Sequence, residues 1–189
     1  MLNTAARNFI SALKVAKDKG FDPLIVLAHA WHESGAFEHI IGLNNYWGVK
    51  TPDNPMNWNG KSVEVWTHEY EPVQDVMAAD GKRPETQDEA LLRIIRKYGR
   101  TNARIDRQIK NNWFVALPQA FRDWDTNQDA ILWYCDFIAK VYPAAFAGRQ
   151  DAAAYFGGLV SGCLKYATDP SYVSQCMATY ENLKKSIVV

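Results

Sequence analysis

Apolar side chains recur at helical spacing over most of the chain. Residues 4–19 carry them at every third or fourth position, and Gly20 follows as a helix stop. Asp22-Pro23 then offers an N-cap and a proline at the first helical position, which predicts a second helix ending near Ser34-Gly35. Similar signals predict further helices at 87–98, from Thr126 through Phe137, at 150–165, and after Asp169-Pro170 through Leu183.

One segment alternates instead. Residues 62–70 read Ser-Val-Glu-Val-Trp-Thr-His-Glu-Tyr, and their β-branched and aromatic content predicts a strand. A lone strand needs a partner, so a small sheet or hairpin is expected. Residues 36–61 and 71–85 are predicted to be loops, and the basic stretch 100–112 a solvated face. The predicted fold class is mainly α: an α+β helical body with a small β element, in a single domain over residues 1–189.

Composition narrows the functional classes. The formal net charge is zero, which argues against a nucleic-acid-binding protein. We find neither a basic membrane-binding segment nor an apolar run long enough to span a bilayer. The N-terminus lacks the features of a signal peptide, so synthesis in the cytoplasm is expected. The odd number of cysteines predicts no disulfide framework, and Cys135, Cys163 and Cys176 are expected to be small buried hydrophobes.

Glu33 is the first candidate for chemistry. It closes an apolar helix, and His29 and Ala30 lie on its face, four and three residues before it. Partial desolvation and the C-terminal end of a helix both disfavour a carboxylate, so we expect a raised pKa. A general acid for glycoside cleavage needs such a pKa. The alternative is a glutamate in a last turn that simply faces water.

Five short motifs follow in order: Glu33-Ser34-Gly35, Asn-Asn-Tyr-Trp-Gly-Val-Lys at 44–50, Trp58-Asn59-Gly60, Thr-His-Glu-Tyr at 67–70, and Tyr-Ala-Thr-Asp-Pro at 166–170. Each is weak alone, but their order over residues 28–180 closely resembles glycoside hydrolase family 73. That family comprises peptidoglycan endo-β-N-acetylglucosaminidases, including bacterial autolysins and phage lysins. The resemblance implies a lysozyme-like fold, in which a groove between a helical body and a small β-lobe receives the glycan.

The resemblance also implies roles for individual residues. Glu33 matches the general acid, Glu69 the second acidic residue on the β-lobe, and Tyr166 a tyrosine near the acid. Glu64, on the opposite face of the predicted strand, is the alternative second carboxylate. Whether that carboxylate acts as base or nucleophile, or the substrate's acetamido group attacks instead, stays open. The expected substrate-binding residues are Asn45, Tyr46, Trp47, Gly48, Trp58 and Tyr70, with Trp58 equally readable as a packing residue.

Some features depart from the family pattern. Ala36-Phe37 replaces the usual Trp-Gly after the first motif, and Trp47 replaces a phenylalanine. The stretch from Glu71 to Trp113 is longer than usual, which predicts an insertion at about 72–112 that flanks the groove. Neither a metal nor a cofactor is implied, since His29 and His32 do not form a zinc motif.

Other functions stay open at this stage. A muramidase or lytic transglycosylase would share the fold, and a non-catalytic wall-binding or tail-structural protein would keep the groove without turnover. The expected partner is bacterial peptidoglycan, with neither nucleic acid nor membrane, and the expected state is a monomer. Without a signal peptide, a phage or prophage lysin, released through a holin or carried by a virion, fits best.

Overall fold

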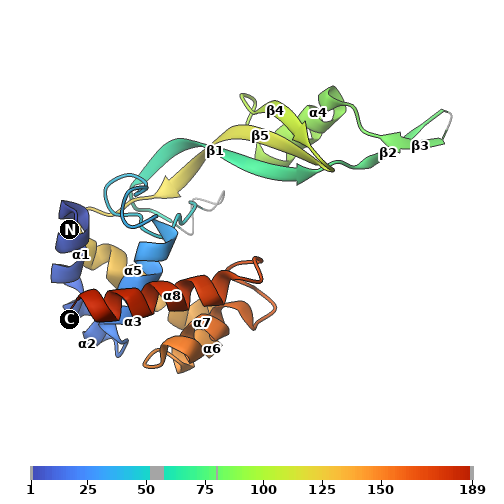
Figure 1. Cartoon of the computed structure of the whole chain (residues 1–189). Helices are drawn as coiled ribbons and strands as arrows, with labels where there is room; N and C mark the ends of the chain where they lie inside the picture. The colour runs from blue at the N-terminus through green and yellow to red at the C-terminus, as the bar shows by residue number, and fades with distance from the viewer. Residues whose placement is uncertain (1, 52–57, 80, 188–189) are drawn as a thin grey trace. The chain divides into compact units, whose positions relative to one another are not determined.

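The computed structural model describes residues 2–51, 58–79 and 81–187, and the chain divides into two compact units. The first, which we call the helical unit, comprises Met1–Lys61 and Arg122–Val189. The second, which we call the β unit, comprises Ser62–Phe121. Figure 1 shows the elements of both. The β unit is thus inserted between two halves of the helical unit in sequence.

The helical unit is built from short capped helices. Side chains of Asn3, Asp22, Thr126 and Asp151 accept hydrogen bonds from the first turns of their helices, as N-caps do. The predicted helix at 4–19 is divided at Leu13 into two. The helices are α1 (Thr4–Ala12), α2 (Lys14–Asp18), α3 (Pro23–Glu33), α5 (Asn127–Val141), α6 (Pro143–Ala147), α7 (Ala152–Val160) and α8 (Tyr172–Ser186).

Helix α3 is the centre of the helical unit. Every residue from Leu24 to Ala30 is buried, because α3 is apolar on nearly all sides and the other helices surround it. Helix α8 packs along α3, and α6 packs against α7 (Figure 1). The one polar side chain within that buried run is His29. Such a residue must find hydrogen-bond partners inside the protein, and those partners define the site described below.

The β unit holds a three-stranded sheet in the order β1-β5-β4, where β1 is Ser62–Pro72, β5 is Asn112–Arg122 and β4 is Arg104–Ile109. Strands β4 and β5 are antiparallel, with a register shift between Ile105 and Arg107. Strands β2 (Asp75–Ala78) and β3 (Gly81–Pro84) form a separate hairpin. Helix α4 (Gln87–Tyr98) lies along the sheet (Figure 1) and shares a small core with it.

The sequence predictions for this region were partly wrong. The predicted helix at 87–98 and its capping box between Thr86 and Glu89 are confirmed. The predicted loop at 71–85 instead holds the end of β1 and the β2–β3 hairpin. The basic stretch at 100–112 contains β4, and the exposure of Arg104, Arg107 and Lys110 confirms the predicted solvated face. Strand β5 was missed because it is the central strand and is buried over most of its length, so its residues do not alternate.

A group of charged side chains joins α4 to the strands. The carboxylates of Glu71 and Glu85 are almost fully buried, and both accept hydrogen bonds from the guanidinium of Arg93 on α4. Lys97 and Tyr98 also donate to Glu71. Buried carboxylates are tolerated when they are paired and hydrogen-bonded, and these partners hold the pKa of both glutamates below the ordinary value.

Two further expectations have clear outcomes. Cys135 and Cys176 are buried free thiols, as predicted, whereas Cys163 is exposed, so the prediction for it was wrong. Cys163 lies just beyond the last residue of α7, where the predicted helix at 150–165 has already ended. Among the described residues, no helix combines the length and the apolar character needed to cross a membrane.

Candidate active site

Glu33 is the last residue of α3, and the chain turns away directly after it. Gly35, Ala36 and Phe37 all adopt positive φ, which is unusual for the two non-glycine residues. Ser34 fastens the turn: its hydroxyl donates to the Ala30 carbonyl at 2.6 Å and accepts from the Phe37 amide at 3.1 Å. The carboxyl of Glu33 is therefore left at the open end of a buried helix, with 21% of its side chain exposed.

Two side chains hold the Glu33 carboxyl. The hydroxyl of Tyr172, the first residue of α8, donates a hydrogen bond of 2.6 Å to Oε1 of Glu33. Nε2 of His29, one turn earlier on α3, lies 3.4 Å from the same oxygen. His29 and Tyr172 also contact each other, with Nε2 2.6 Å from the hydroxyl oxygen. The three groups form a tight triangle at the edge of the core.

The pKa of Glu33 is lowered, opposite to the expectation from sequence. Burial is the largest single influence and does raise the pKa, as expected. The contact with His29, the hydroxyl of Tyr172 and the charge of His32 all favour the ionised form, and together they outweigh burial. The prediction failed because it counted only the desolvation and the helix end, whereas His29 on the same face and the hydroxyl of Tyr172, far away in sequence, both favour the carboxylate.

Tyr166 lies beside this triangle. Its ring is 4.7 Å from that of His29 and stacks at 6.0 Å on that of Tyr172, between ring centroids. Its amide donates to the Leu159 carbonyl at 2.9 Å, which fastens the loop between α7 and α8. Burial and the nearby Glu33 charge raise the pKa of its hydroxyl well above the usual range.

The hydroxyl that reaches the carboxyl is nevertheless that of Tyr172, which sequence reasoning did not single out. Tyr172 lies two residues beyond the Tyr-Ala-Thr-Asp-Pro motif and begins α8, which packs on α3 and α7. A tyrosine at the first position of a predicted helix gives no sign of what its hydroxyl will meet. The only available signal was its closeness to the motif.

The segment from Asn45 to Gly48 lies mostly inside the core. The Asn45 amide donates to the carbonyls of Val49 and Arg122 at 2.9 and 2.8 Å and so closes the loop. The rings of Tyr46 and Trp47 are almost fully buried. Only Gly48, which adopts a positive φ, is exposed. Asn45, Tyr46 and Trp47 therefore support the site from within the core. A direct contact of these residues with the substrate remains a prediction.

Trp47 links that segment to the triangle. Its ring stacks on the ring of Tyr134 from α5, with centroids 4.0 Å apart and an angle of 6° between the planes. The hydroxyl of Tyr134 contacts Nδ1 of His29, the ring nitrogen on the side away from Tyr172. The second motif therefore reaches the carboxyl of Glu33 indirectly, through Tyr134 and His29.

Trp58 is packed on both an edge and a face. Its ring meets Trp124 edge-on at 5.5 Å, its Nε1 donates to the Lys61 carbonyl at 3.0 Å, and the guanidinium of Arg122 lies 4.6 Å over its face. These contacts supply the packing role that the sequence left open. A sugar could stack on the face under Arg122 only if the guanidinium moved.

In the β unit, Glu69 and Tyr70 lie on β1 and point to opposite faces of the sheet. Glu69 is half-buried and accepts a hydrogen bond of 2.9 Å from the amide of Gln119 on β5. Tyr70 is 60% exposed and Trp66, on the same face, 49% exposed. Glu64 is exposed on the face of Tyr70, so the alternation expected from sequence is confirmed.

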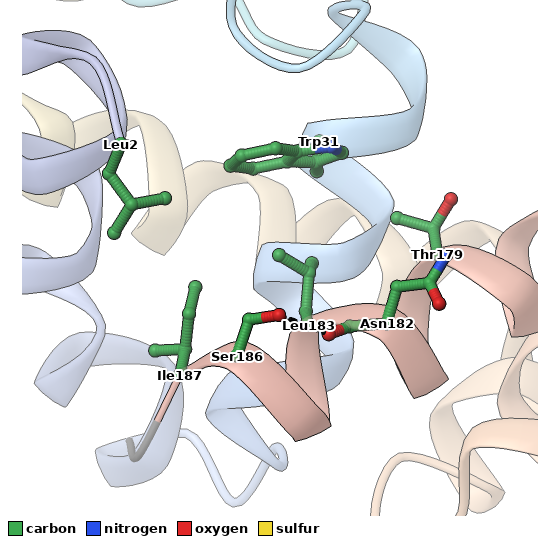
Figure 2. A pocket seen from close by; sticks show the side chains of 7 residues that line it. All are labelled: Leu2, Trp31, Thr179, Asn182, Leu183, Ser186 and Ile187. Atoms are coloured by element: carbon green, nitrogen blue, oxygen red, sulfur yellow. Dashed lines mark hydrogen bonds between the residues drawn. The ribbon is translucent and has the colours of Figure 1, made fainter.

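A cavity of about 490 Å³ lies elsewhere in the helical unit, among Leu2, Trp31 and the C-terminal turns of α8 (Figure 2). Trp31 is two residues from Glu33 and therefore on a different side of α3. None of the side chains that line this cavity in the described chain is acidic. The cavity does not contain the candidate catalytic group, and the carboxyl of Glu33 remains the centre of the site.

A helical body with a small β element and a half-buried carboxyl at a helix end defines an α+β glycoside hydrolase of lysozyme-like fold. A family model described as mannosyl-glycoprotein endo-beta-N-acetylglucosaminidase matches residues 10–185. The chain therefore belongs to this glucosaminidase family, glycoside hydrolase family 73, as its motifs predicted. The predicted fold class and the expected glycoside hydrolase activity are both confirmed.

Solved structures with the same fold are similar over nearly the whole chain. A peptidoglycan hydrolase mutant from Sphingomonas sp. A1 is 23% identical with a TM-score of 0.58, and covers 94% of this chain and 92% of its own. The catalytic domain of the autolysin Auto from Listeria monocytogenes is 16% identical, with a TM-score of 0.59 and coverages of 97% and 87%. A truncated glycoside hydrolase domain of FlgJ from Salmonella typhimurium is 18% identical, with a TM-score of 0.56 and coverages of 95% and 98%. None of the curated proteins matches the chain.

Proposed function

We propose that the chain hydrolyses the β-1,4 bond on the reducing side of N-acetylglucosamine in bacterial peptidoglycan, with Glu33 as the general acid. The observation that carries this proposal is the triangle of Glu33, Tyr172 and His29 at the open end of α3. Membership of the glucosaminidase family supports the bond type. The similar fold of the peptidoglycan hydrolase from Sphingomonas sp. A1 supports the substrate.

The chemistry assigned to Glu33 is proton donation. The protonated carboxyl gives its proton to the glycosidic oxygen as the bond from the anomeric carbon breaks, and the leaving sugar departs as an alcohol. The hydroxyl of Tyr172 then donates to the new carboxylate and stabilises it. A water molecule adds to the anomeric carbon, and its proton is taken up by a carboxylate of the site. Glu33 is protonated again, from that carboxylate or from solvent, before the next turnover.

Glu69 is proposed as the second carboxylate. Its hydrogen bond from Gln119 fixes the orientation of the carboxyl while leaving it half-exposed, as a base or nucleophile needs. Glu64 remains the alternative on the other face of β1. Replacement of each by glutamine in turn separates them: Glu69→Gln should abolish turnover and Glu64→Gln should leave it intact.

Substrate contacts are proposed for the exposed groups. The ring of Tyr70, 60% exposed, offers a flat platform for a sugar. The backbone at Gly48 is open, since a Cβ added there would meet nothing within 4 Å. Tyr166, packed beside the triangle, is proposed to help position the acetamido group near Glu33. The inserted residues 72–112 are proposed to influence which substrates bind.

Two points of the proposal go beyond membership of the family: which bond is cleaved, and how the protein reaches the wall. A muramidase or transglycosylase would use the same acid on a different bond or with a different product, and the released fragments distinguish them. Delivery to the wall through a holin or with a virion, as a phage lysin, also belongs to the proposal.

The test compares two glutamate-to-glutamine variants on peptidoglycan embedded in a gel. Glu33→Gln removes the acid, whereas Glu38→Gln makes the same change at an exposed residue five positions later. The expected result is clearing by the wild type and Glu38→Gln and none by Glu33→Gln. Clearing by Glu33→Gln at the wild-type rate would contradict the role of Glu33. Absence of clearing by the wild type, with binding retained, would favour a wall-binding protein.

A further inference from the structure

The buried imidazole of His29 belongs to a continuous chain of hydrogen-bonding groups. His29 has 0% exposure, and its two nitrogens each meet a tyrosine hydroxyl: Tyr134 at Nδ1, and Tyr172 at Nε2 at 2.6 Å. The hydroxyl of Tyr134 continues to that of Tyr155. Tyr172 ends the chain of groups on Glu33. Helices α5, α7 and α8 each supply one hydroxyl to a line that crosses the core.

The direction of these hydrogen bonds follows from the end of the line. An ionised carboxylate can only accept, so the proton of the Tyr172 hydroxyl points at Glu33. With its own proton so placed, the Tyr172 oxygen can only accept from His29, and Nε2 must carry a hydrogen. In a neutral imidazole Nδ1 is then an acceptor, so Tyr134 donates to His29 and Tyr155 donates to Tyr134.

We propose that His29 is a positioning residue of the hydrolase, whose neutral ring, with its hydrogen on Nε2, makes Tyr172 an obligate donor to Glu33. This rests on the proposed role of Glu33 as the general acid. Tyr134 fixes the tautomer of His29 from the other side of the ring. The line of donors thereby stabilises the carboxylate that proton donation leaves behind, and it orients that carboxylate toward the open end of α3.

Among the groups around Glu33, His29 is the one that sets the direction of the hydrogen bond from Tyr172. The titratable side chains that face Glu33 and His29 come from every neighbouring element: His32 on α3, Tyr134 on α5, Tyr155 on α7, Tyr166 in the following loop, and Tyr172 and Cys176 on α8. Burial raises the pKa of the tyrosines and of Cys176, so these groups stay neutral in the range where a carboxyl titrates. His32 contributes charge to Glu33 without joining the line of hydrogen bonds.

The consequence for Glu33 is a definite shift. Without the Nε2 hydrogen of His29, the Tyr172 hydroxyl is free to turn and accept a hydrogen bond from a protonated Glu33. The protonated form is then favoured, and the pKa of Glu33 rises. Because the acid must be protonated to act, the descending limb of activity against pH moves to higher pH, and the weaker acid transfers its proton more slowly.

The first experiment reads the tautomer without any turnover. Nitrogen-15 NMR of the wild type, recorded at the pH of the assays, should show His29 neutral, with a hydrogen on Nε2 and a bare Nδ1. Tyr134→Phe removes the donor to Nδ1 and should shift the tautomer toward hydrogen on Nδ1. A hydrogen on Nδ1 in the wild type, or on both nitrogens, would overturn the proposal whatever the enzyme cleaves.

The second experiment uses a matched pair of substitutions at His29. His29→Leu removes both nitrogens, whereas His29→Gln is neutral and can still donate from its amide nitrogen to Tyr172 and accept from Tyr134 at its oxygen. We expect His29→Leu to lower kcat by about 10- to 100-fold and to move the descending limb to higher pH, with little change in KM. His29→Gln should restore most of kcat and the original limb.

Two results would overturn the proposal. If His29→Gln behaves like His29→Leu, the charge of an imidazolium matters rather than the pattern of donors. If His29→Leu keeps the wild-type limb, His29 only fills the core. Thermal melting of each variant shows whether it is folded. If His29→Leu does not fold, the pH profile of Tyr134→Phe is measured in its place. A descending limb of Tyr134→Phe at the wild-type pH would then count against the proposal. Full activity of Glu33→Gln would instead remove the proposed function, leaving the NMR result standing.

Discussion

Tyr172 donates a hydrogen bond of 2.6 Å to Oε1 of Glu33, although 139 residues separate the two in sequence. The hydroxyl comes from the first turn of α8 and the carboxyl from the last turn of α3, and the two helices pack side by side. The hydrogen bond favours the ionised carboxyl and is one reason for the lowered pKa of Glu33.

Tyr172→Phe should weaken the acid. The substitution removes the donor to the carboxylate, so the pKa of Glu33 should rise and kcat should fall by about tenfold or more. Tyr180→Phe removes a hydroxyl from the same helix, where it lies 3.5 Å from Asp22, and is the matched control. The kcat of both variants is measured from the rate at which they cleave soluble glycan fragments. Equal rates for Tyr172→Phe and the control would contradict the assignment.

The wild type should be most active on the acidic side of neutrality. Glu33 must hold a proton to act as an acid, and its neighbours lower its pKa below the ordinary glutamate value. Activity should therefore fall as pH rises through that lowered pKa. The measurement is kcat/KM against pH. A rate that rises steadily from acidic pH to neutrality would contradict the role of Glu33 as the acid.

The β unit should lose stability in acid. The pKa values of Glu71 and Glu85 are lowered, with the buried carboxyl of Glu71 held by Lys97 and Tyr98, and that of Glu85 chiefly by Arg93. A lowered pKa means that the stabilisation is present above the ordinary carboxyl pKa and disappears as pH falls through the lowered one. Circular dichroism of the chain at decreasing pH should show an early loss of strand signal.

Arg93→Met should destabilise the chain by about 3 kcal/mol at neutral pH, because two buried carboxylates lose their shared guanidinium. Arg96→Met makes the same change at an exposed position of α4 and should have little effect. Urea unfolding of the two variants provides the comparison. Equal midpoints would mean that the paired charges contribute nothing to the docking of α4.

Neighbouring glycines on α7 should respond in opposite ways. A Cβ at Gly158 would collide with the backbone of Ala144 and Ala145 on α6, whereas a Cβ at Gly157 meets nothing within 4 Å. Gly158→Ala should cost about 1–3 kcal/mol through overpacking. Gly157→Ala should be neutral or stabilising, because alanine favours the helix. Thermal melting of both measures how much the close packing of α6 on α7 contributes to stability, and equal melting temperatures would contradict that contribution.

The sequence predicted those elements whose signals are local. Caps such as Asp22-Pro23 and Thr86 with Glu89 specify their helices within a few residues, and Glu33 was found because a motif surrounds it. Strand β5 was not predicted because its burial is set by neighbours that are distant in sequence. The role of Tyr172 was missed for the same reason, because its contact with Glu33 crosses from α8 to α3. The sign of the Glu33 pKa shift was missed because His29, on the same helix, and Tyr172 together outweigh burial.

The most direct test of the proposed chemistry is mass spectrometry of fragments released from purified peptidoglycan, with and without borohydride reduction, by the wild type and Glu33→Gln. We expect fragments that end in reducing N-acetylglucosamine from the wild type and none from the variant. Ends of reducing N-acetylmuramic acid or of 1,6-anhydro sugar would contradict the proposed bond or course. Unchanged release by Glu33→Gln would contradict the role of Glu33 as the acid.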